Sequence, residues 1–421
     1  MTRERVAVVG AGVAGLTAAY LLARRYEVLL LEADDRLGGH AHTHDVCTGD
    51  GRTIGIDSGF IVHNGRTYPN LLRLFGELGV VTQETEMSMS VRCDGCGLEY
   101  AGARGLNGLF AQRARVTNPA FLRMLSEVPR FHRHAHRVLA GSAAEDVTLG
   151  DFLADGGYSR YFIDHFALPL VSAVWSVDQQ AGMRYPARYL FTFLRHHGML
   201  SVTGSPTWRT VVGGSRRYTE RVVKELAAVR LSTPVRSVRR HADGVHLHDA
   251  NGHLHEADRV VVATHADQAL RMLADPTPAE REVLGAFGYS RNETVLHTDA
   301  AALPTARGAR ASWNYRKPAC AAGQDRVQVT YYMNRLMRLT EPVDYLVTLN
   351  ATHRVADGSA LARMVYHHPV YTPDSLAAQR RLPELATART VYAGAYHGWG
   401  FHEDGCASGV RAAEAFGASW T

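Results

Sequence analysis

The sequence predicts an α/β fold that opens with a parallel strand–helix–strand unit and continues into a second part built from both helices and strands. Residues 5–32 alternate an apolar run, an alanine-rich helical stretch and a second apolar run. Farther along, residues 121–140 carry apolar side chains at helical spacing, whereas residues 326–333 alternate as a strand does. With 421 residues, the chain is long enough for two domains of ordinary size.

The composition excludes several classes of protein. Only Lys224 and Lys317 are lysines, so the net charge of +5 comes from arginines scattered along the chain, and no basic run indicates a nucleic-acid groove. The first apolar strand begins by Val6, which leaves no room for a signal peptide. No apolar stretch reaches the roughly 18 residues of a transmembrane helix. We therefore expect a cytoplasmic protein with no transmembrane segment and no nucleic-acid partner.

The five cysteines form no disulfide framework, which fits a reducing compartment. Cys93 and Cys96 do form a CDGC motif, but there is no second pair and no nearby histidine at ligand spacing. We interpret Asp94-Gly95 as a two-residue turn of a hairpin flanked by cysteines, in preference to a zinc site or a redox dithiol. No metal site is expected.

A glycine loop follows the first strand. Its G-x-G-x-x-G spacing is formed by Gly10, Gly12 and Gly15. The first glycine permits a tight turn, the second lets a pyrophosphate approach the backbone, and the third allows close helix packing. The strand after the helix, residues 28–31, ends in Glu32, which is placed to accept hydrogen bonds from a ribose hydroxyl. This Rossmann-type context indicates dinucleotide binding, and NAD and FAD both use it.

The residues after Glu32 distinguish these two cofactors. Arg36, Gly38 and Gly39 resemble the R-x-G-G extension of flavoproteins in the flavin amine oxidase and phytoene desaturase superfamily. The segments IDSGFIVHNGRTYPNL from Ile56 and AGAYHGWGFHEDGCASGVRAAE from Ala393 are similar to one bacterial family in it, usually described as predicted NAD/FAD-binding proteins or FAD-dependent oxidoreductases. This resemblance implies FAD as the cofactor.

The resemblance also implies a domain organisation, an amine oxidase-like two-domain flavoprotein. We expect a Rossmann-type FAD-binding domain from residues 1–75, 205–290 and 385–421, and a second, discontinuous α+β substrate-binding domain from residues 76–204 and 291–384. Within the middle segment, Asp243-Gly244 and Asn251-Gly252 predict the turns of a hairpin-like insertion. The C-terminal segment is expected to return and complete the first sheet.

Carried over to this sequence, the resemblance assigns cofactor contacts. Residues 57–60 would lie along the flavin, Val235 would pair with the adenine, and amides of the last helix would stabilise negative charge on the reduced ring. The predicted cofactor-binding residues are Gly10, Gly12, Gly15, Glu32, Ala33, Arg36, Gly38, Gly39, His40, Asp57, Ser58, Gly59, Phe60, Val235, Ala263, Thr264, Gly394, His402, Glu403, Asp404, Gly405 and Ala407.

The expected chemistry is hydride transfer to the flavin. Amine oxidases of the superfamily commonly keep a lysine near the reactive flavin nitrogen, but the matching segment, SRNETVLHTD from Ser290, has none, and only Lys317 is close in sequence. We therefore predict an FAD-dependent oxidoreductase of the dehydrogenase or desaturase type, acting on a small or lipid-like apolar substrate with an unknown electron acceptor. The alternatives are a flavin amine oxidase that releases an imine and hydrogen peroxide, a redox-neutral double-bond isomerase, and a flavin-binding scaffold protein.

Catalytic and pocket residues are less well defined by the sequence. Histidine can accept a proton near neutral pH, so His197, His397 and His402 are the candidate bases. Aromatic and amide side chains in the segments that carry the resemblance are expected to line the substrate pocket, with core packing as the competing interpretation. These are Trp175, Trp313, Tyr315, Tyr331, Asn334 and Tyr396.

Overall fold

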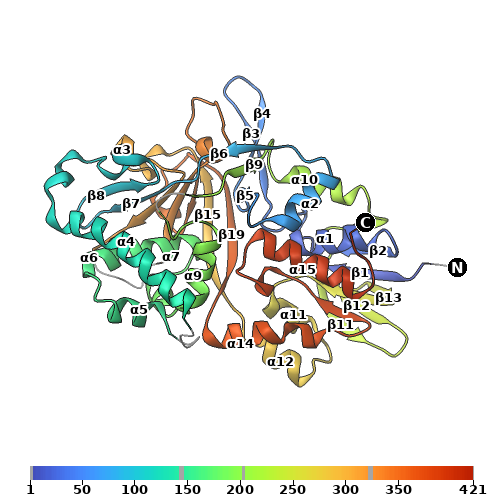
Figure 1. Cartoon of the computed structure of the whole chain (residues 1–421). Coiled ribbons are helices and arrows are strands. Elements are labelled where there is room, and N and C mark those ends of the chain that lie inside the picture. The colour runs from blue at the N-terminus through green and yellow to red at the C-terminus, as the bar shows by residue number, and fades with distance from the viewer. Residues whose placement is uncertain (1–2, 142–146, 202–203, 321–325, 421) are drawn as a thin grey trace.

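A five-stranded parallel sheet forms the centre of one half of the molecule (Figure 1). The computed structural model describes residues 3–141, 147–201, 204–320 and 326–420. The strand order is β10 (Ala228–Arg230), β2 (Glu27–Leu31), β1 (Arg5–Val9), β14 (Arg259–Val262) and β20 (Thr390–Tyr392). Strands far apart in the sequence thus share one sheet, and the last strand completes it as expected.

Both faces of this sheet are covered, which explains its continuous apolar strands. Val6 and Val8 are fully buried toward the helices α1 (Val13–Leu22) and α15 (His402–Ala415). Ala7 and Val9 face the other side, which is covered by an antiparallel sheet of β11 (Val235–Arg240), β12 (Val245–Asp249) and β13 (Leu254–Ala257), and by α11 (Ala266–Met272) and α12 (Pro278–Gly285). The predicted hairpin-like insertion is confirmed.

Helices α1 and α15 pack with their backbones in contact. A Cβ atom at Gly409 would lie 2.3 Å from the carbonyl oxygen of Ala14, and one at Gly405 would lie 2.6 Å from Val13 Cγ1. Glycine is therefore required at both positions for this approach. The contact brings the first turn of α15 beside the first turn of α1.

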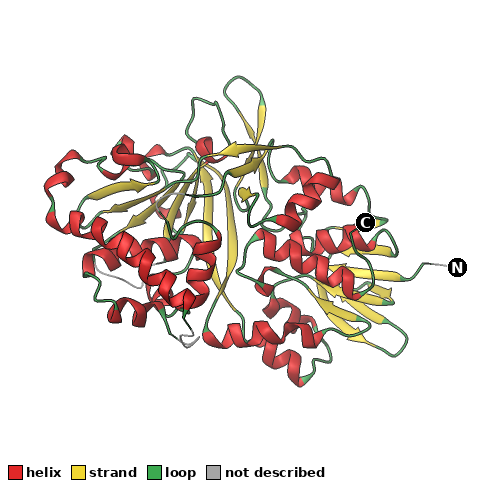
Figure 2. Ribbon diagram, in the orientation of Figure 1, coloured by secondary structure: helices red, strands yellow, loops and turns green. Residues whose placement is uncertain are grey.

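The other half of the molecule contains a seven-stranded sheet covered by helices (Figure 2). Its order is β19 (Ala360–Val370), β15 (Gly288–His297), β18 (Leu346–Leu349), β17 (Gln328–Tyr332), β16 (Trp313–Lys317), β7 (Met89–Cys93) and β8 (Leu98–Gly102). Only the pair β16–β7 is parallel among these described strands. The helical layer consists chiefly of α4 (Pro119–Ala140), α5 (Leu149–Asp155), α7 (Leu168–Trp175), α8 (Gln179–Met183) and α9 (Ala187–His196).

Two small sheets lie at the junction of the halves. One contains β3 (Thr43–Cys47) and β4 (Thr53–Asp57), and the other has the order β5 (Val62–Asn64), β9 (Trp208–Val211), β6 (Thr82–Thr85). The remaining helices are α2 (Pro69–Glu77), α3 (Gly105–Leu109), α6 (Arg160–Phe162), α10 (Arg216–Val223), α13 (Met333–Leu336) and α14 (Pro373–Arg381). We propose that the two large sheets mark the two domains expected from the sequence.

The CDGC motif lies in a hairpin, but its turn is longer than predicted. Cys93 pairs with Leu98, so residues 94–97 form a four-residue turn in place of the expected two-residue turn at Asp94-Gly95. The longer turn places Cys96 inside the loop, so its side chain does not belong to either face of the sheet.

Across the described residues, no helix is both long and apolar enough to cross a membrane.

The close contact between α1 and α15 predicts opposite effects of one substitution at two helical glycines. Gly409→Ala should lower the free energy of unfolding by about 1–3 kcal/mol, because the added methyl group overlaps the backbone of α1. The matched control, Gly76→Ala, places the methyl group in open space in helix α2 and should gain up to about 1 kcal/mol. Urea unfolding measures both. Equal effects at the two positions would contradict the close packing.

Candidate active site

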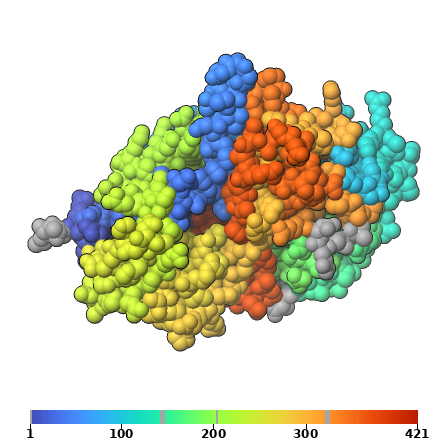
Figure 3. Space-filling model, turned by 180° about the vertical axis from the view of Figure 1, so that it is seen from behind, coloured from blue at the N-terminus to red at the C-terminus, as the bar shows by residue number. Residues whose placement is uncertain are grey.

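A cavity with a volume of about 1110 Å³ lies at the carboxyl edge of the five-stranded sheet. The residues that follow β1, β2, β14 and β20 all line it, namely Gly10, Glu32, Ala263 and Gly394. Figure 3 shows a hollow on this side of the molecule, where early, middle and late segments of the chain meet. Ligands of parallel α/β sheets bind at this edge. The volume exceeds the roughly 300–1,000 Å³ of most small-molecule pockets, so it can hold a dinucleotide with space remaining.

The glycine loop forms a cradle of backbone that is open to the cavity at the start of α1. Gly10 has a φ of +100°, and a Cβ atom there would lie 2.7 Å from the carbonyl oxygen of Ala263. A Cβ atom at Gly15 would lie 1.9 Å from the carbonyl oxygen of Gly10, so this position requires glycine for packing and does not line the cavity. Gly12 lines the cavity and has open space where a Cβ would be. No side chain caps the first turn of α1, so its amides are available to an anion.

The R-x-G-G segment closes against this loop. The amide of Gly38 donates to the carbonyl oxygen of Ala11 at 2.8 Å, and a Cβ at Gly39 would lie 3.2 Å from Gly12 Cα. Arg36 lines the cavity and donates through Nη1 to the carbonyl oxygen of Gly39 at 2.8 Å. Two glycine-rich strands of backbone and one guanidinium thus surround the same space, which fits a pyrophosphate.

Glu32 is held in place by the backbone at the end of β2. Its Oε2 accepts a hydrogen bond from the amide of Ala11 at 2.6 Å, and its Oε1 accepts one from Asp34 at 2.9 Å. Burial raises the pKa of this carboxyl. The carboxylate therefore links the glycine loop to β2. Glu32 also lines the cavity, as its predicted contact with a ribose hydroxyl requires.

Most of the predicted cofactor-binding residues line the cavity. They are Gly10, Gly12, Glu32, Ala33, Arg36, Gly38, Gly39, His40, Gly59, Phe60, Val235, Ala263, Thr264, Gly394 and His402. The structure brings these residues together from distant parts of the chain. Their contacts with FAD remain predictions.

Asp57 and Ser58 do not line the cavity; they make hydrogen bonds with residues next to it. Asp57 is buried and accepts hydrogen bonds from the amide and hydroxyl of Ser215, and burial raises its pKa to about 6. Ser58 Oγ lies 2.6 Å from the hydroxyl of Tyr366, which does line the cavity. The carboxylate of Asp57 thus holds the backbone at Ser215 in place and does not face the cavity.

The first turn of α15 also differs from the prediction, because only His402 faces the cavity. Glu403 accepts hydrogen bonds from the amides of Asn70 and Leu71 at 3.0 Å and so caps helix α2. Asp404 accepts from the amide of Phe401, and burial raises its pKa to about 7. The remaining two predicted residues lie farther along α15 and do not line the cavity, namely Gly405 and Ala407.

Aromatic and aliphatic side chains form a large part of the cavity lining. We use the name apolar wall for the set Met87, Val174, Trp175, Phe193, Met199, Trp208, Trp313 and Tyr331. Trp175, Trp313 and Tyr331 were predicted to line the pocket, and Tyr396, also predicted, lines the cavity as well. Trp313 and Tyr331 meet edge to face with ring centroids 5.1 Å apart.

Two predicted pocket residues lie elsewhere. Tyr315 is buried in the core under the helices, and its hydroxyl accepts a hydrogen bond from Gln179 at 3.0 Å. Asn334 fixes a turn, because its amide nitrogen donates to the carbonyl oxygen of Val343 and its oxygen accepts from the amide of Tyr345. The prediction for Tyr315 was wrong because the sequence does not show which face of β16 turns to the cavity, and that for Asn334 was wrong because the expected strand ends at Tyr332 and Asn334 lies in α13.

A group of histidines that the sequence did not single out lines the cavity beside the predicted His40. The ring of His40 lies 5.4 Å from that of His368 and 6.3 Å from that of His265. Burial lowers the pKa of His265 to about 4 and that of His368 to about 4, and it holds the pKa of His40 well below its usual range. These imidazoles are therefore uncharged near pH 7. The adjacent histidines His367 and His368 were the feature of the sequence that could have indicated this group.

The three candidate bases differ in position. His197 and His402 line the cavity, but His397 does not. His197 is anchored by the carbonyl oxygen of Phe193 at 3.0 Å, and burial lowers its pKa to about 4. His402 stacks on Phe60 with 3.8 Å between ring centroids, contacts the hydroxyl of Tyr218 through Nε2, and has its pKa lowered to about 3 by burial.

The parallel sheet, the glycine loop and the cavity define a dinucleotide-binding oxidoreductase fold. The model of the flavin-containing amine oxidoreductase family matches residues 13–297, so the chain belongs to this family. The FAD cofactor and the amine oxidase-like two-domain architecture predicted from the sequence are accordingly confirmed.

Relatives share part of the chain. The "Putative flavin-containing monoamine oxidase AofH" of Mycobacterium tuberculosis is 29% identical over 292 residues, which cover 64% of this chain and 59% of the relative. The (S)-6-hydroxynicotine oxidase of Paenarthrobacter nicotinovorans is 26% identical over 286 residues, with 65% and 63% covered. The chain thus matches about six tenths of the length of these relatives.

Solved structures share the fold at low sequence identity. Cyclohexylamine oxidase from Brevibacterium oxydans aligns with a TM-score of 0.68 and 16% identity over 98% of both chains. A fatty acid isomerase from P. acnes, described as producing CLA, aligns with a TM-score of 0.67 and 16% identity over 98% of this chain and 97% of that one. These likenesses show the fold alone.

The open space at Gly12 predicts a selective loss of cofactor. Gly12→Val would place an isopropyl group in the cavity next to the amides of α1, and we expect FAD content below about a tenth of wild type with a folded protein. The ratio of flavin to protein absorbance, with circular dichroism for folding, measures this. Gly102→Val, also in open space but outside the cavity, should keep its FAD. Retention of FAD by both variants would contradict the cradle.

Buried histidines predict a loss of stability in acid. Burial lowers the pKa of His397 to about 3 from an ordinary 6.5. Between these values the unfolded chain binds the proton and the folded chain does not, so stability falls as the pH drops through this window. His397→Asn should reduce the slope of the unfolding free energy against pH in this window by up to about 1.4 kcal/mol per pH unit.

Urea unfolding at several pH values between 5 and 8 would measure that slope. The carboxyls of Asp57 and Asp404, whose pKa values burial raises, contribute the opposite slope, but they do so in every variant. The control His353→Asn changes an exposed histidine and should keep the wild-type slope. An unchanged slope in His397→Asn would contradict burial of a neutral imidazole.

Proposed function

We propose that this FAD-dependent oxidoreductase accepts a hydride from an uncharged, small or lipid-like apolar substrate, as a dehydrogenase or desaturase does. The observation that carries the proposal is the separation of charge in the cavity. Its charged lining side chains are Glu32, Asp34, Arg36, Arg236 and Arg271. All five come from the five-stranded half, after β2 or from β11 and α11, whereas the apolar wall consists of aromatic and aliphatic side chains.

The position of the lysines supports an apolar substrate. Lys317 is buried under the helical layer, where Nζ donates to the carbonyl oxygen of Asp164 at 2.9 Å. Lys224, the other lysine of the chain, follows helix α10 and does not line the cavity. The lysine that amine oxidases commonly keep beside the flavin therefore has no counterpart in the cavity, which disfavours efficient amine oxidation with oxygen.

The residues divide into two functional groups. The glycine loop, the amides of α1, Glu32 and Arg36 would hold FAD, which supplies the hydride acceptor when bound. The apolar wall would exclude water and orient the substrate by contact with its carbon chain. His197 and His402 are the candidates to take a proton, since both line the cavity as neutral imidazoles.

A flavin amine oxidase is the second candidate, supported by the family and by relatives whose names describe amine or nicotine oxidation. A substrate ammonium group would need recognition without a carboxylate, because the described lining has acids only at Glu32 and Asp34. Aromatic rings such as Trp313 and Tyr331 could provide it through cation–π contact. A redox-neutral double-bond isomerase is the third candidate.

Anaerobic bleaching of the flavin distinguishes these candidates. We expect a pool of fatty-acyl compounds to bleach the absorbance of the holoenzyme, and a pool of amines to leave it unchanged. Trp313→Ala should slow the bleaching about tenfold or more, because it opens the apolar wall. Trp420→Ala, the same change in a partly buried residue outside the cavity, should not.

Each other outcome selects another function. Bleaching by amines with release of peroxide in air would establish the amine oxidase and overturn the proposal. Conversion of an unsaturated lipid without net bleaching and without an external acceptor would establish the isomerase. A holoenzyme that no pool bleaches or converts would favour the scaffold protein.

A further inference from the structure

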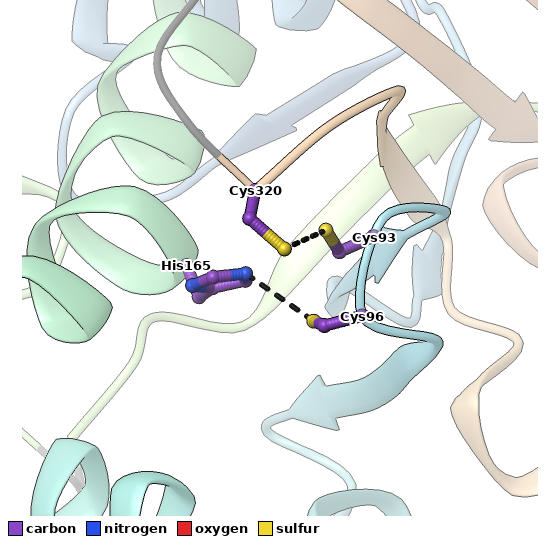
Figure 4. A group of neighbouring side chains, drawn as sticks. All are labelled: Cys93, Cys96, His165 and Cys320. Carbon is purple, nitrogen blue, oxygen red and sulfur yellow. Dashed lines mark hydrogen bonds between the residues drawn. The ribbon is translucent and has the colours of Figure 1, made fainter.

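Three cysteines and one histidine meet at a point outside the cavity (Figure 4). Cys93 ends β7, Cys96 lies in the turn after it, Cys320 follows β16, and His165 lies in the short helical segment Ile163–Ala167 between α6 and α7. Their ligand atoms all lie within 4.8 Å of one another. No metal site was expected from the sequence, because no second cysteine pair and no histidine lie near the CDGC motif in the chain, but the fold supplies a third cysteine and a histidine from distant segments.

The distances match a tetrahedral site. The Sγ atoms of Cys93 and Cys320 are 3.7 Å apart, and Sγ of Cys96 lies 3.5 Å from Nε2 of His165. A zinc ion with Zn–S bonds of about 2.3 Å and a Zn–N bond of about 2.0–2.1 Å places two sulfurs about 3.8 Å apart and a sulfur and nitrogen about 3.5 Å apart. Two opposite edges of the group therefore have the lengths expected of a zinc tetrahedron, and its other four edges are no longer than 4.8 Å.

Backbone contacts bring the segment that carries Cys320 close to the CDGC turn. Strand β16 runs parallel to β7 with Lys317 beside Cys93, and the amide of Asp94 donates to the carbonyl oxygen of Lys317 at 2.8 Å. A Cβ at Gly95 would lie 2.8 Å from the amide nitrogen of Cys320. Glycine in the CDGC turn thus lets the segment that carries Cys320 lie against the turn.

The surroundings orient the histidine. Nδ1 of His165 lies 3.1 Å from the carbonyl oxygen of Tyr161, which fixes that nitrogen as the protonated one and leaves Nε2 free to bind a metal. The ring of Tyr161 stacks on the imidazole with centroids 4.2 Å apart. Metal-binding histidines are commonly held by such a second hydrogen bond.

A buried lysine near the cysteines offsets the negative charge that a zinc–thiolate site would carry. Three thiolates and one zinc ion carry a net charge of −1, which is costly to bury without a partner. Lys317 is buried beside Cys93 in the pairing of β16 with β7, and its Nζ lies 3.8 Å from Oδ1 of Asp164. One of the two lysines of the chain thus lies where a zinc–thiolate site needs a cation.

We propose that Cys93, Cys96, Cys320 and His165 bind one zinc ion in a closed, structural site. All four coordination positions come from the protein, so no position is left for a substrate or a water. The ion would join the β7–β8 turn, the end of β16 and the helical segment that leads into α7. Since α7 ends at Trp175 of the apolar wall, the site would stabilise that wall without taking part in the reaction.

Elemental analysis of the purified holoenzyme tests the proposal directly. After expression in zinc-containing medium and washing with EDTA, we expect about one zinc per chain. Cys320→Ser should release its zinc to a chelator at least about 100-fold faster than wild type. Cys47→Ser, which changes an exposed cysteine away from the site, should keep the wild-type zinc content.

Cobalt provides an independent readout. Co²⁺ added to the metal-free protein should give d–d absorption bands on the red side of the flavin spectrum, with the intensity of a tetrahedral, thiolate-rich site. His165→Gln should shift these bands while the FAD content stays that of wild type. This variant keeps the test valid if Cys320→Ser fails to fold.

Three results would overturn the site. A protein that contains no zinc and takes up neither zinc nor cobalt after reduction of its thiols would exclude it. Alkylation and mass spectrometry that show Cys93 and Cys320 joined as a disulfide in the freshly isolated protein would replace zinc with a redox pair. Equal loss of zinc from Cys320→Ser and Cys47→Ser would identify the metal as adventitious. None of these results depends on which substrate the enzyme uses.

Discussion

The close contact of Gly15 with the carbonyl oxygen of Gly10 is the constraint on which the cavity depends. A side chain at Gly15 would overlap that oxygen, so only glycine lets α1 begin directly at the edge of the sheet. Helix α15 then packs against α1 through Gly405 and Gly409. Two helix starts and the ends of four strands consequently meet around one cavity, and residues from both ends of the chain form its cofactor side.

The parts of this arrangement that depend on local pattern could be predicted from the sequence. The glycine loop, Glu32 at the end of the second strand and the R-x-G-G segment are defined by spacing within about 30 residues. The hairpins after Val235 follow from turn residues flanked by alternating strands. In each case a single turn or helix start determines where the side chains lie, so few alternatives exist.

Features that depend on the order and register of distant strands could not be predicted. Tyr315 and Asn334 belong to segments that approach the cavity, but the pairing of β16 directs Tyr315 away from it, and Asn334 lies in α13, beyond the end of β17. Only some of the 22 histidines line the cavity, and nothing local distinguishes His265 from the others. Cys320 reaches the CDGC turn because β16 lies beside β7, which are more than 200 residues apart in the chain.

Strands β15 and β19 pair along nearly their whole length, and both extend from the seven-stranded sheet to the cavity, where Tyr289 and His368 line it. A hinge that separated the halves would have to bend this two-stranded ladder and break hydrogen bonds that water could not replace at once. Continuous backbone pairing between β15 and β19 therefore opposes a hinge motion between the two halves, and it fixes Tyr289 and His368 relative to each other across the ladder that carries them to the cavity.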